Sequence, residues 1–91
     1  MEVKSSNSEK IITILSKKGT FKILNLLAEA PKRYNELRKT VSSDKTLSQR
    51  LKELESGQLI ETISQKSGSR SFIHYRITDK AVKIMAKVKE L

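Results

Sequence analysis

Six residues in the segment 45–52 can donate a hydrogen bond to a phosphate or to the edge of a base: Lys45, Thr46, Ser48, Gln49, Arg50 and Lys52. Leu47, Leu51 and Leu54 recur at i, i+4 and i+7, the spacing of the buried stripe of an α-helix. The six donors then lie on or beside the exposed face, with the acids Glu53 and Glu55 toward its C-terminal end. Glutamine pairs with adenine and Arg or Lys with guanine in the major groove, so this pattern predicts a recognition helix for duplex DNA. The alternative is an ordinary solvated helix face.

A second group of donors lies around Gly68, between two segments with strand character: Lys66, Ser67 and Arg70. Residues 59–65 and 71–77 are rich in β-branched and aromatic residues, and Ile73, Tyr75 and Ile77 occupy alternate positions of the second segment. We expect a β-hairpin in which these three side chains face inward and His74 faces outward. Its basic loop, residues 66–70, would touch phosphate or a minor groove; the alternative is a generic polar loop.

Three further donors precede the recognition helix and could contact the DNA backbone: Arg33, Asn35 and Arg38. The helices that position all these groups are delimited by turn and capping residues. A helix from residue 8 is predicted to end near Gly19, and Thr20 to cap a second helix that Pro31 stops. Asn35 is predicted to cap a short third helix, residues 42–44 to begin the fourth, and Thr78 to cap the last.

These elements predict a chain that is mainly α with a β-hairpin wing, in the order α-α-α-α-β-β-α. Two short helices joined by a tight turn and followed by a hairpin with a basic tip form the plan of a winged helix-turn-helix, an α+β fold. We expect residues 1–8 to be a flexible N-terminal arm and residues 9–91 to be a single winged-helix DNA-binding domain with terminal dimerisation helices.

The two terminal helices carry more apolar residues than such a core requires: Ile11, Ile12, Ile14, Leu15, Val82, Met85 and Val88. Only 36% of the 91 residues are apolar, and an isolated chain of this size buries only about 60–65% of its unfolded surface. We therefore expect these helices to form a homodimer interface that places two recognition helices about 34 Å apart, one turn of DNA. The alternative is that both helices simply cap the monomer.

The residue types that the chain lacks exclude several functions. There is no cysteine, which excludes disulfides, thiolate metal sites and cysteine nucleophiles. The single histidine has no acidic companions, and the serines have no His/Asp arrangement to activate them, so we expect no enzyme activity, no cofactor and no metal. No apolar run approaches the roughly 18 residues of a membrane span. A net charge of +9 favours a polyanionic partner, and we expect a cytoplasmic, nucleoid-associated protein whose small-molecule effector, if any, is open.

Three parts of the chain resemble the HxlR-like and MarR/ArsR-like prokaryotic transcription regulators: residues 19–27 with 31–37, residues 47–55 with 57–60, and residues 75–80, which begin Gly19-Thr20-Phe21, Leu47-Ser48-Gln49 and Tyr75-Arg76-Ile77. The middle stretch resembles the HxlR recognition helix running into its first wing strand. The resemblance implies a cytoplasmic, dimeric, sequence-specific DNA-binding repressor or activator of bacterial or archaeal type. Two alternatives remain, a protein-binding winged-helix adaptor of the transcription machinery and a nonspecific, chromatin-like DNA-binding protein.

Overall fold

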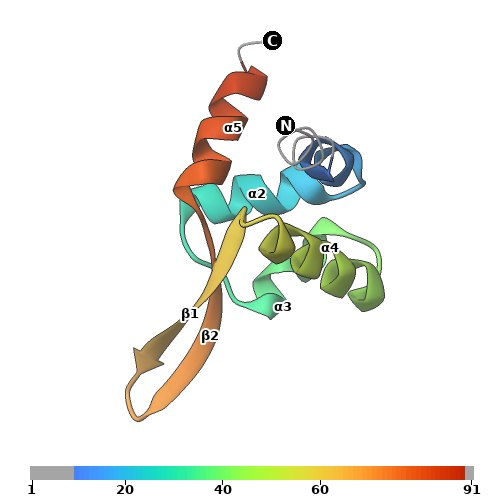
Figure 1. The fold of residues 1–91 in the computed structure, drawn as a ribbon. Helices are drawn as coiled ribbons and strands as arrows, with labels where there is room; N and C mark the ends of the chain where they lie inside the picture. Colours follow the sequence, from blue (N-terminus) through green and yellow to red (C-terminus); the bar gives the residue numbers. More distant parts are fainter. Residues whose placement is uncertain (1–9, 90–91) are drawn as a thin grey trace.

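The computed structural model describes residues 10–89 of the chain as a helical body with a two-stranded hairpin projecting from it (Figure 1). A first helix covers residues 10–16 of the described part. The later elements are α2 (Thr20–Glu29), α3 (Tyr34–Leu37), the 3-10 turn η1 (Arg38–Thr40), α4 (Asp44–Ser56), β1 (Ile60–Ser67), β2 (Arg70–Ile77) and α5 (Asp79–Lys89). This is the predicted winged helix-turn-helix order. The predicted N-terminal arm, residues 1–8, lies outside the described residues.

The core forms where the predicted helical stripes meet. Leu47, Leu51 and Leu54 of α4 are at most 2% exposed, and they pack in one cluster with Leu24 and Leu27 of α2. A buried leucine stripe at this spacing removes one face of α4 from water, which leaves the opposite face for solvent or a ligand.

The junction between the first helix and α2 differs from the prediction in the role of Thr20. Gly19 takes a left-handed conformation, with φ 88°, that glycine adopts without the steric cost of a Cβ. Thr20 does not cap α2 as predicted but is its first residue, with its buried hydroxyl donating to the Ile14 carbonyl at 2.8 Å. The prediction failed because a threonine hydroxyl can satisfy either an amide of its own helix or a carbonyl of the preceding one.

The other helix beginnings agree with the sequence in two cases out of three. The Ser43 hydroxyl accepts from the Thr46 amide and caps α4, and the Thr78 hydroxyl accepts from the Ala81 amide at the start of α5. The predicted cap at Asn35 is wrong, because α3 begins at Tyr34 and Arg33 holds the N-cap position, two residues before Asn35.

The chain leaves α4 through an unusual left-handed residue. Gln58 has φ 62°, and its amide donates to the Glu55 carbonyl while the Leu59 amide donates to the Leu54 carbonyl. This pair of bonds is the Schellman arrangement, in which glycine normally holds the left-handed position. The carbonyls of Leu54 and Glu55 are thereby satisfied where α4 passes into β1.

The hairpin is longer and its turn shorter than predicted. Ser67 pairs with Arg70, so only Gly68 and Ser69 form the turn, and Gly68 has φ 67° as a type II′ turn requires. Lys66, Ser67 and Arg70 therefore lie at the ends of the strands rather than in a loop. On the other edge of β2, Lys32 forms an isolated antiparallel bridge with Tyr75.

The prediction that alternate side chains of β2 face the core is correct only at the base of the hairpin. Tyr75 and Ile77 pack against the core as expected, but Ile73 is 57% exposed. Phe72 and His74, on the opposite face, are half-buried instead. The physical reason is that the helical body covers only the base of the hairpin, so alternation no longer separates core from solvent along the outer half.

The terminal helices use part of their apolar surface within the monomer. Ile14 and Met85 belong to the core, and Ile11 and Leu15 pack partly against it. Ile12, Val82 and Val88 are exposed, at 65%, 48% and 36%. Across residues 10–89, no helix has the length and apolar character needed to cross a membrane.

Candidate nucleic-acid interface

The helix-turn-helix consists of α3, η1 and α4, and two side chains fasten its halves together. The Arg38 guanidinium binds the Asp44 carboxylate at two points, Nε to Oδ1 at 2.9 Å and Nη2 to Oδ2 at 3.1 Å. The Tyr34 hydroxyl donates to the Asp44 carbonyl at 3.1 Å and lies 3.0 Å from Ser48 Oγ. Sequence reasoning missed Tyr34, since its partners lie 10 and 14 residues away. Both contacts set the N-terminal end of α4 relative to α3.

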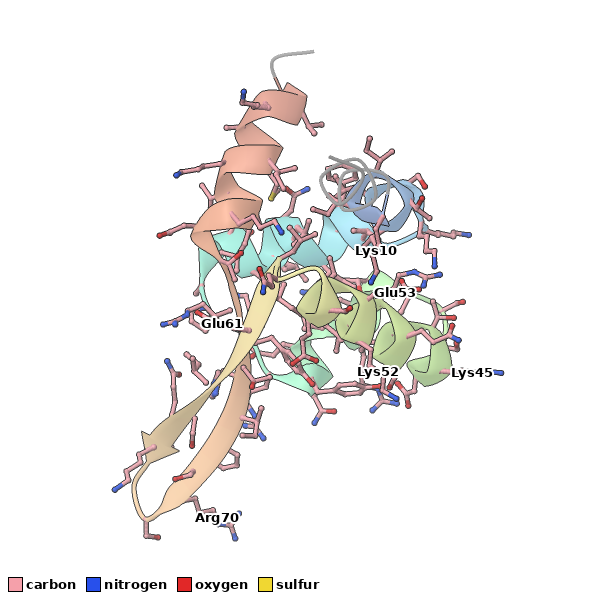
Figure 2. The ribbon with its side chains drawn as sticks, in the orientation of Figure 1. Lys10, Lys45, Lys52, Glu53, Glu61 and Arg70 are labelled. Carbon is pink, nitrogen blue, oxygen red and sulfur yellow. The ribbon has the colours of Figure 1, made fainter. Side chains whose placement is uncertain are left out.

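The exposed face of α4 contains only part of the predicted donor set. Lys45, Gln49 and Lys52 are exposed, whereas Thr46 and Ser48 are half-buried beside the links to Ser43 and Tyr34. Figure 2 shows Lys45 projecting from the N-terminal end of α4 into solvent. Lys45 and Gln49 are four residues apart and lie on one face of the helix, which gives a solvent-exposed pair of a cation and an amide.

Arg50 lies beside that exposed face, as Thr46 and Ser48 do, and its side chain is paired within the protein. Its side chain is 15% exposed, with Nη1 on Glu53 Oε1 at 3.0 Å and Nε donating to the Lys18 carbonyl at 3.3 Å. Glu53 also accepts from Lys17 Nζ at 2.5 Å. These contacts join α4 to the segment that follows the first helix.

Glu53 is the centre of this cluster and keeps its charge. Partial burial acts to raise its pKa, but the hydrogen bonds and positive charges of Lys17 and Arg50 outweigh burial and hold the pKa below its usual range. The acid that the sequence places toward the C-terminal half of α4 is therefore neutralised by two cations of the same protein.

The wing carries its donors at its far end. Lys66, Ser67 and Arg70 are all exposed, and Arg70 projects from the tip in Figure 2. Nearer the base, Arg76 Nε donates to Glu61 Oε2 at 2.9 Å across the strands. The hairpin thus has a charge-paired base and a cationic tip.

Arg33 lies between the helix-turn-helix and the wing. Its guanidinium carbon is 4.2 Å from the centre of the Phe72 ring, a cation–π contact that orients the side chain while leaving its charge in place. A shallow hollow beside it is lined by Gln65, Lys66 and His74 among others.

The Arg33 backbone is fixed as well, because its amide donates to Glu36 Oε1 at 2.8 Å. This bond holds the pKa of the Glu36 carboxyl below its usual range. Of the other predicted backbone contacts, Asn35 is exposed on α3, whereas Arg38 is held by Asp44.

The described residues contain no cluster of three or more His, Asp or Glu side chains with the geometry of a metal site. What the residues bring together is a set of exposed cations and amides on α4, α3 and the hairpin. These elements lie on the side of α2 away from α5 (Figure 1), so one elongated ligand could reach all of them.

Residues 14–91 match the HxlR-like helix-turn-helix family. The HTH-type transcriptional regulator YodB of Bacillus subtilis (strain 168) is 31% identical over 85 residues, which span 91% of this chain and 75% of YodB. The structure of reduced YodB superposes with a TM-score of 0.77, at 30% identity, covering 90% of this chain and 81% of that one. The homodimeric winged helix-turn-helix DNA-binding domain Mb0332 of Mycobacterium bovis has a TM-score of 0.75 at 24% identity, covering 97% and 80%. This last likeness is one of fold.

Proposed function

The chain belongs to the HxlR-like helix-turn-helix family of transcriptional regulators, and from that premise we propose that it binds a specific sequence of double-stranded DNA as a homodimer. In this proposal α4 enters the major groove and the tip of the hairpin contacts the backbone or the minor groove. The protein would act in the cytoplasm, associated with the nucleoid.

The observation that carries the proposal is the division of the surface of α4. Its leucine stripe is buried, and of the two acids in its C-terminal half Glu53 is neutralised by Lys17 and Arg50 while Glu55 is exposed. Lys45 and Gln49 remain exposed on the face turned away from the core. A groove of about 12 Å admits one helix, and the residues near the N-terminal end of a recognition helix contact base edges. Lys45 and Gln49 would therefore read bases, with Thr46, Ser48 and Lys52 beside them.

The backbone contacts would come from the elements on either side of α4. Lys66, Ser67 and Arg70 at the tip of the wing would bind phosphate, as would Arg33 and Asn35 from the start of α3. Arg38 and Arg50 would contribute by holding α4 at its angle, because their guanidinium donors are already committed to Asp44 and to Glu53.

Support for the homodimer comes from the apolar residues that the monomer leaves uncovered. Ile12, Val82 and Val88 are exposed on the two terminal helices, where a second copy could cover them. Mb0332, which shares the fold, is a homodimer. Ile14 and Met85 would support such an interface from within the core, and Ile11 and Leu15 from its margin.

The experiment is a selection of bound sequences from a random duplex pool, followed by titrations of the selected duplex at several salt concentrations. We expect a palindromic site with half-sites about one turn apart. Gln49→Ala should change the base preference, whereas Lys66→Ala should weaken all sequences similarly and reduce the salt slope by about 0.9 per phosphate lost. Lys83→Ala, on the exposed face of α5, is the matched control. No affinity for any duplex at low salt would refute the proposal and favour a protein partner.

A further inference from the structure

The outer half of the hairpin carries a hollow of about 330 Å³. Along the hairpin it lies between Glu61, near the base, and Arg70, at the tip (Figure 2). The residues that line it come from the two strands and from the segment before α3: Arg33, Gln65, Lys66, Ser67, Phe72 and His74. These described lining residues include two permanent cations, an amide and a hydroxyl, and they include no carboxylate. Such donors are the groups with which proteins bind phosphate.

Arg33 is held beside the hollow by its stack on Phe72. The guanidinium carbon lies 4.2 Å from the centre of the ring. A guanidinium that stacks on an aromatic face keeps its N–H donors in its own plane, where a phosphate oxygen can accept from them. The stack therefore orients Arg33 for an anion and leaves its charge available.

His74 is the residue of the hollow whose hydrogen bonding changes with pH. Its Nδ1 lies 3.2 Å from the carbonyl oxygen of Phe72. A carbonyl only accepts, so in the neutral ring Nδ1 carries the proton and Nε2 is an acceptor. A phosphate oxygen is an acceptor as well, so the neutral ring offers it no donor at Nε2. Protonation converts Nε2 into a positively charged donor, and histidine is the side chain that takes up a proton between about pH 5 and 8.

The hairpin surrounds His74 mainly with positive charge. Arg70 and Arg76 lie on the same face of β2 as His74, because side chains of one strand alternate between its two faces. From β1, Lys66 lines the same hollow, and Glu61 is bound by Arg76 across the strands. The one carboxylate that the hairpin brings to this face is therefore already paired.

Glu36 of α3 is the acid that competes with an anion for a protonated His74. Its carboxylate accepts from the Arg33 amide at 2.8 Å. That bond holds the pKa of the Glu36 carboxyl below its usual range, and nearby positive charge, including that of His74, acts in the same direction. Glu36 meets His74 as a single exposed carboxylate, whereas a phosphate in the hollow would meet Arg33 and Lys66 as well.

We propose that this hollow binds a phosphate of the DNA backbone and that protonation of His74 completes the site, so that affinity for DNA rises as the pH falls. The phosphate would lie between Arg33, Lys66 and His74. This inference rests on the proposed function and adds to it a contact that is present only when His74 is charged. His74 is the only histidine of the 91 residues and there is no cysteine, so few other groups change charge between pH 5.5 and 8.

The first test measures binding of the selected duplex at pH 5.5 and pH 8. A partly solvated charge pair is worth about two- to fivefold in affinity, so two protomers should bind about four- to 25-fold more tightly at pH 5.5. The log–log salt slope should also be steeper at pH 5.5 by about 0.9 for each protomer. Equal affinities at the two pH values would overturn the role of His74 and leave the proposed function standing. No binding of any duplex at either pH would refute the proposed function itself.

Three variants assign the proton. His74→Gln is neutral at both pH values and should remove most of the pH dependence, whereas His74→Arg should bind tightly at both. Glu36→Gln keeps the acceptor for the Arg33 amide but loses the charge, and its pH dependence should persist. The urea midpoint of each variant at both pH values shows that it is folded. A pH dependence that survives in His74→Gln, or one that disappears in Glu36→Gln, would show that the assignment to a His74–phosphate contact is wrong.

NMR of the wild-type histidine ring distinguishes DNA from free phosphate. The midpoint of the His74 ring titration should move to higher pH when the duplex binds, because a ligand that prefers the charged ring favours its protonation. Inorganic phosphate, at the same concentration of phosphate groups and without DNA, should move the midpoint less. An equal movement with inorganic phosphate would show a site for a free anion, and an unchanged midpoint with duplex would show that no phosphate reaches the ring. Either result would overturn the proposal.

Discussion

Replacing Gly19 by alanine tests how the helix-turn-helix is held against the first two helices. Gly19 has φ 88°, and a Cβ added there would come closer than 3.0 Å to Cγ1 of Val41, in the turn that precedes α4. An L-residue in the left-handed region costs about 1–2 kcal/mol, and forcing a methyl group into a filled space costs about 1–3 kcal/mol. Alanine recovers about 0.4–1 kcal/mol by restricting the unfolded chain.

The expected net loss is about 1–5 kcal/mol, a large part of the total for a domain of this size. Urea unfolding followed by far-UV circular dichroism measures it directly. Gly57→Ala is the matched control, because Gly57 has φ −82° and an added Cβ would lie 3.6–3.8 Å from its neighbours, ordinary contact distances. That variant should be neutral or slightly stabilising.

A double-mutant cycle separates the two causes of the Gly19→Ala loss. Val41→Ala removes the methyl group that the new Cβ would meet but leaves the left-handed backbone unchanged. Gly19→Ala should therefore cost about 1–2 kcal/mol less in the Val41→Ala background. If Gly19→Ala stays within about 0.5 kcal/mol of wild type, or if Gly57→Ala costs as much, the reasoning from backbone angle and contact is refuted.

Three other substitutions probe the joints around α4. Gln58→Gly should raise the free energy of unfolding by about 0.5–1 kcal/mol, because glycine removes the left-handed strain at a small entropic cost; an unchanged urea midpoint would contradict this. Tyr34→Phe should cost about 1 kcal/mol by removing the hydroxyl between Asp44 and Ser48, and a neutral result would show that neither bond contributes. Glu53→Gln should cost about 1 kcal/mol near neutral pH. Since the folded state lowers the pKa of Glu53, that stability is present above the ordinary carboxyl pKa of 4.5 and is lost as pH falls through the lower folded value. The difference between wild type and Glu53→Gln should then shrink on acidification, and a constant difference would count against the charge cluster.

The helices of the fold could be predicted from local patterns. Leu47, Leu51 and Leu54 define the buried stripe of α4 by spacing alone, and Ser43 and Thr78 cap their helices through bonds to amides three residues away. Such contacts depend only on near neighbours in the chain, so periodicity and capping chemistry are sufficient to place them.

The parts that could not be predicted depend on residues far apart in the chain. Arg50 resembles a groove-facing donor in sequence, but the Lys18 carbonyl, 32 residues away, and Glu53 draw it back onto the protein. Ile73 looks like a core residue by alternation, yet the helical body ends before it. A pattern of period two cannot show where the partner surface of a strand stops.

Arg38 is paired with Asp44, and Arg50 is paired with Glu53. Because of these ion pairs, the salt dependence of DNA binding is a quantitative test of the interface. Five cations of each protomer remain exposed at the proposed contacts: Arg33, Lys45, Lys52, Lys66 and Arg70. If each neutralises one phosphate, a dimer releases counterions from about ten, and the log–log slope of affinity against salt should approach −9. If Arg38 and Arg50 also left their carboxylates to bind phosphate, about fourteen contacts would give a slope near −13.

Glu53→Gln and Asp44→Asn would free these arginines, so each variant should steepen the slope if the pairs withhold them from DNA. A wild-type slope near −13 that neither variant changes would show that the pairs open on DNA, and that Arg38 and Arg50 bind phosphate rather than position α4.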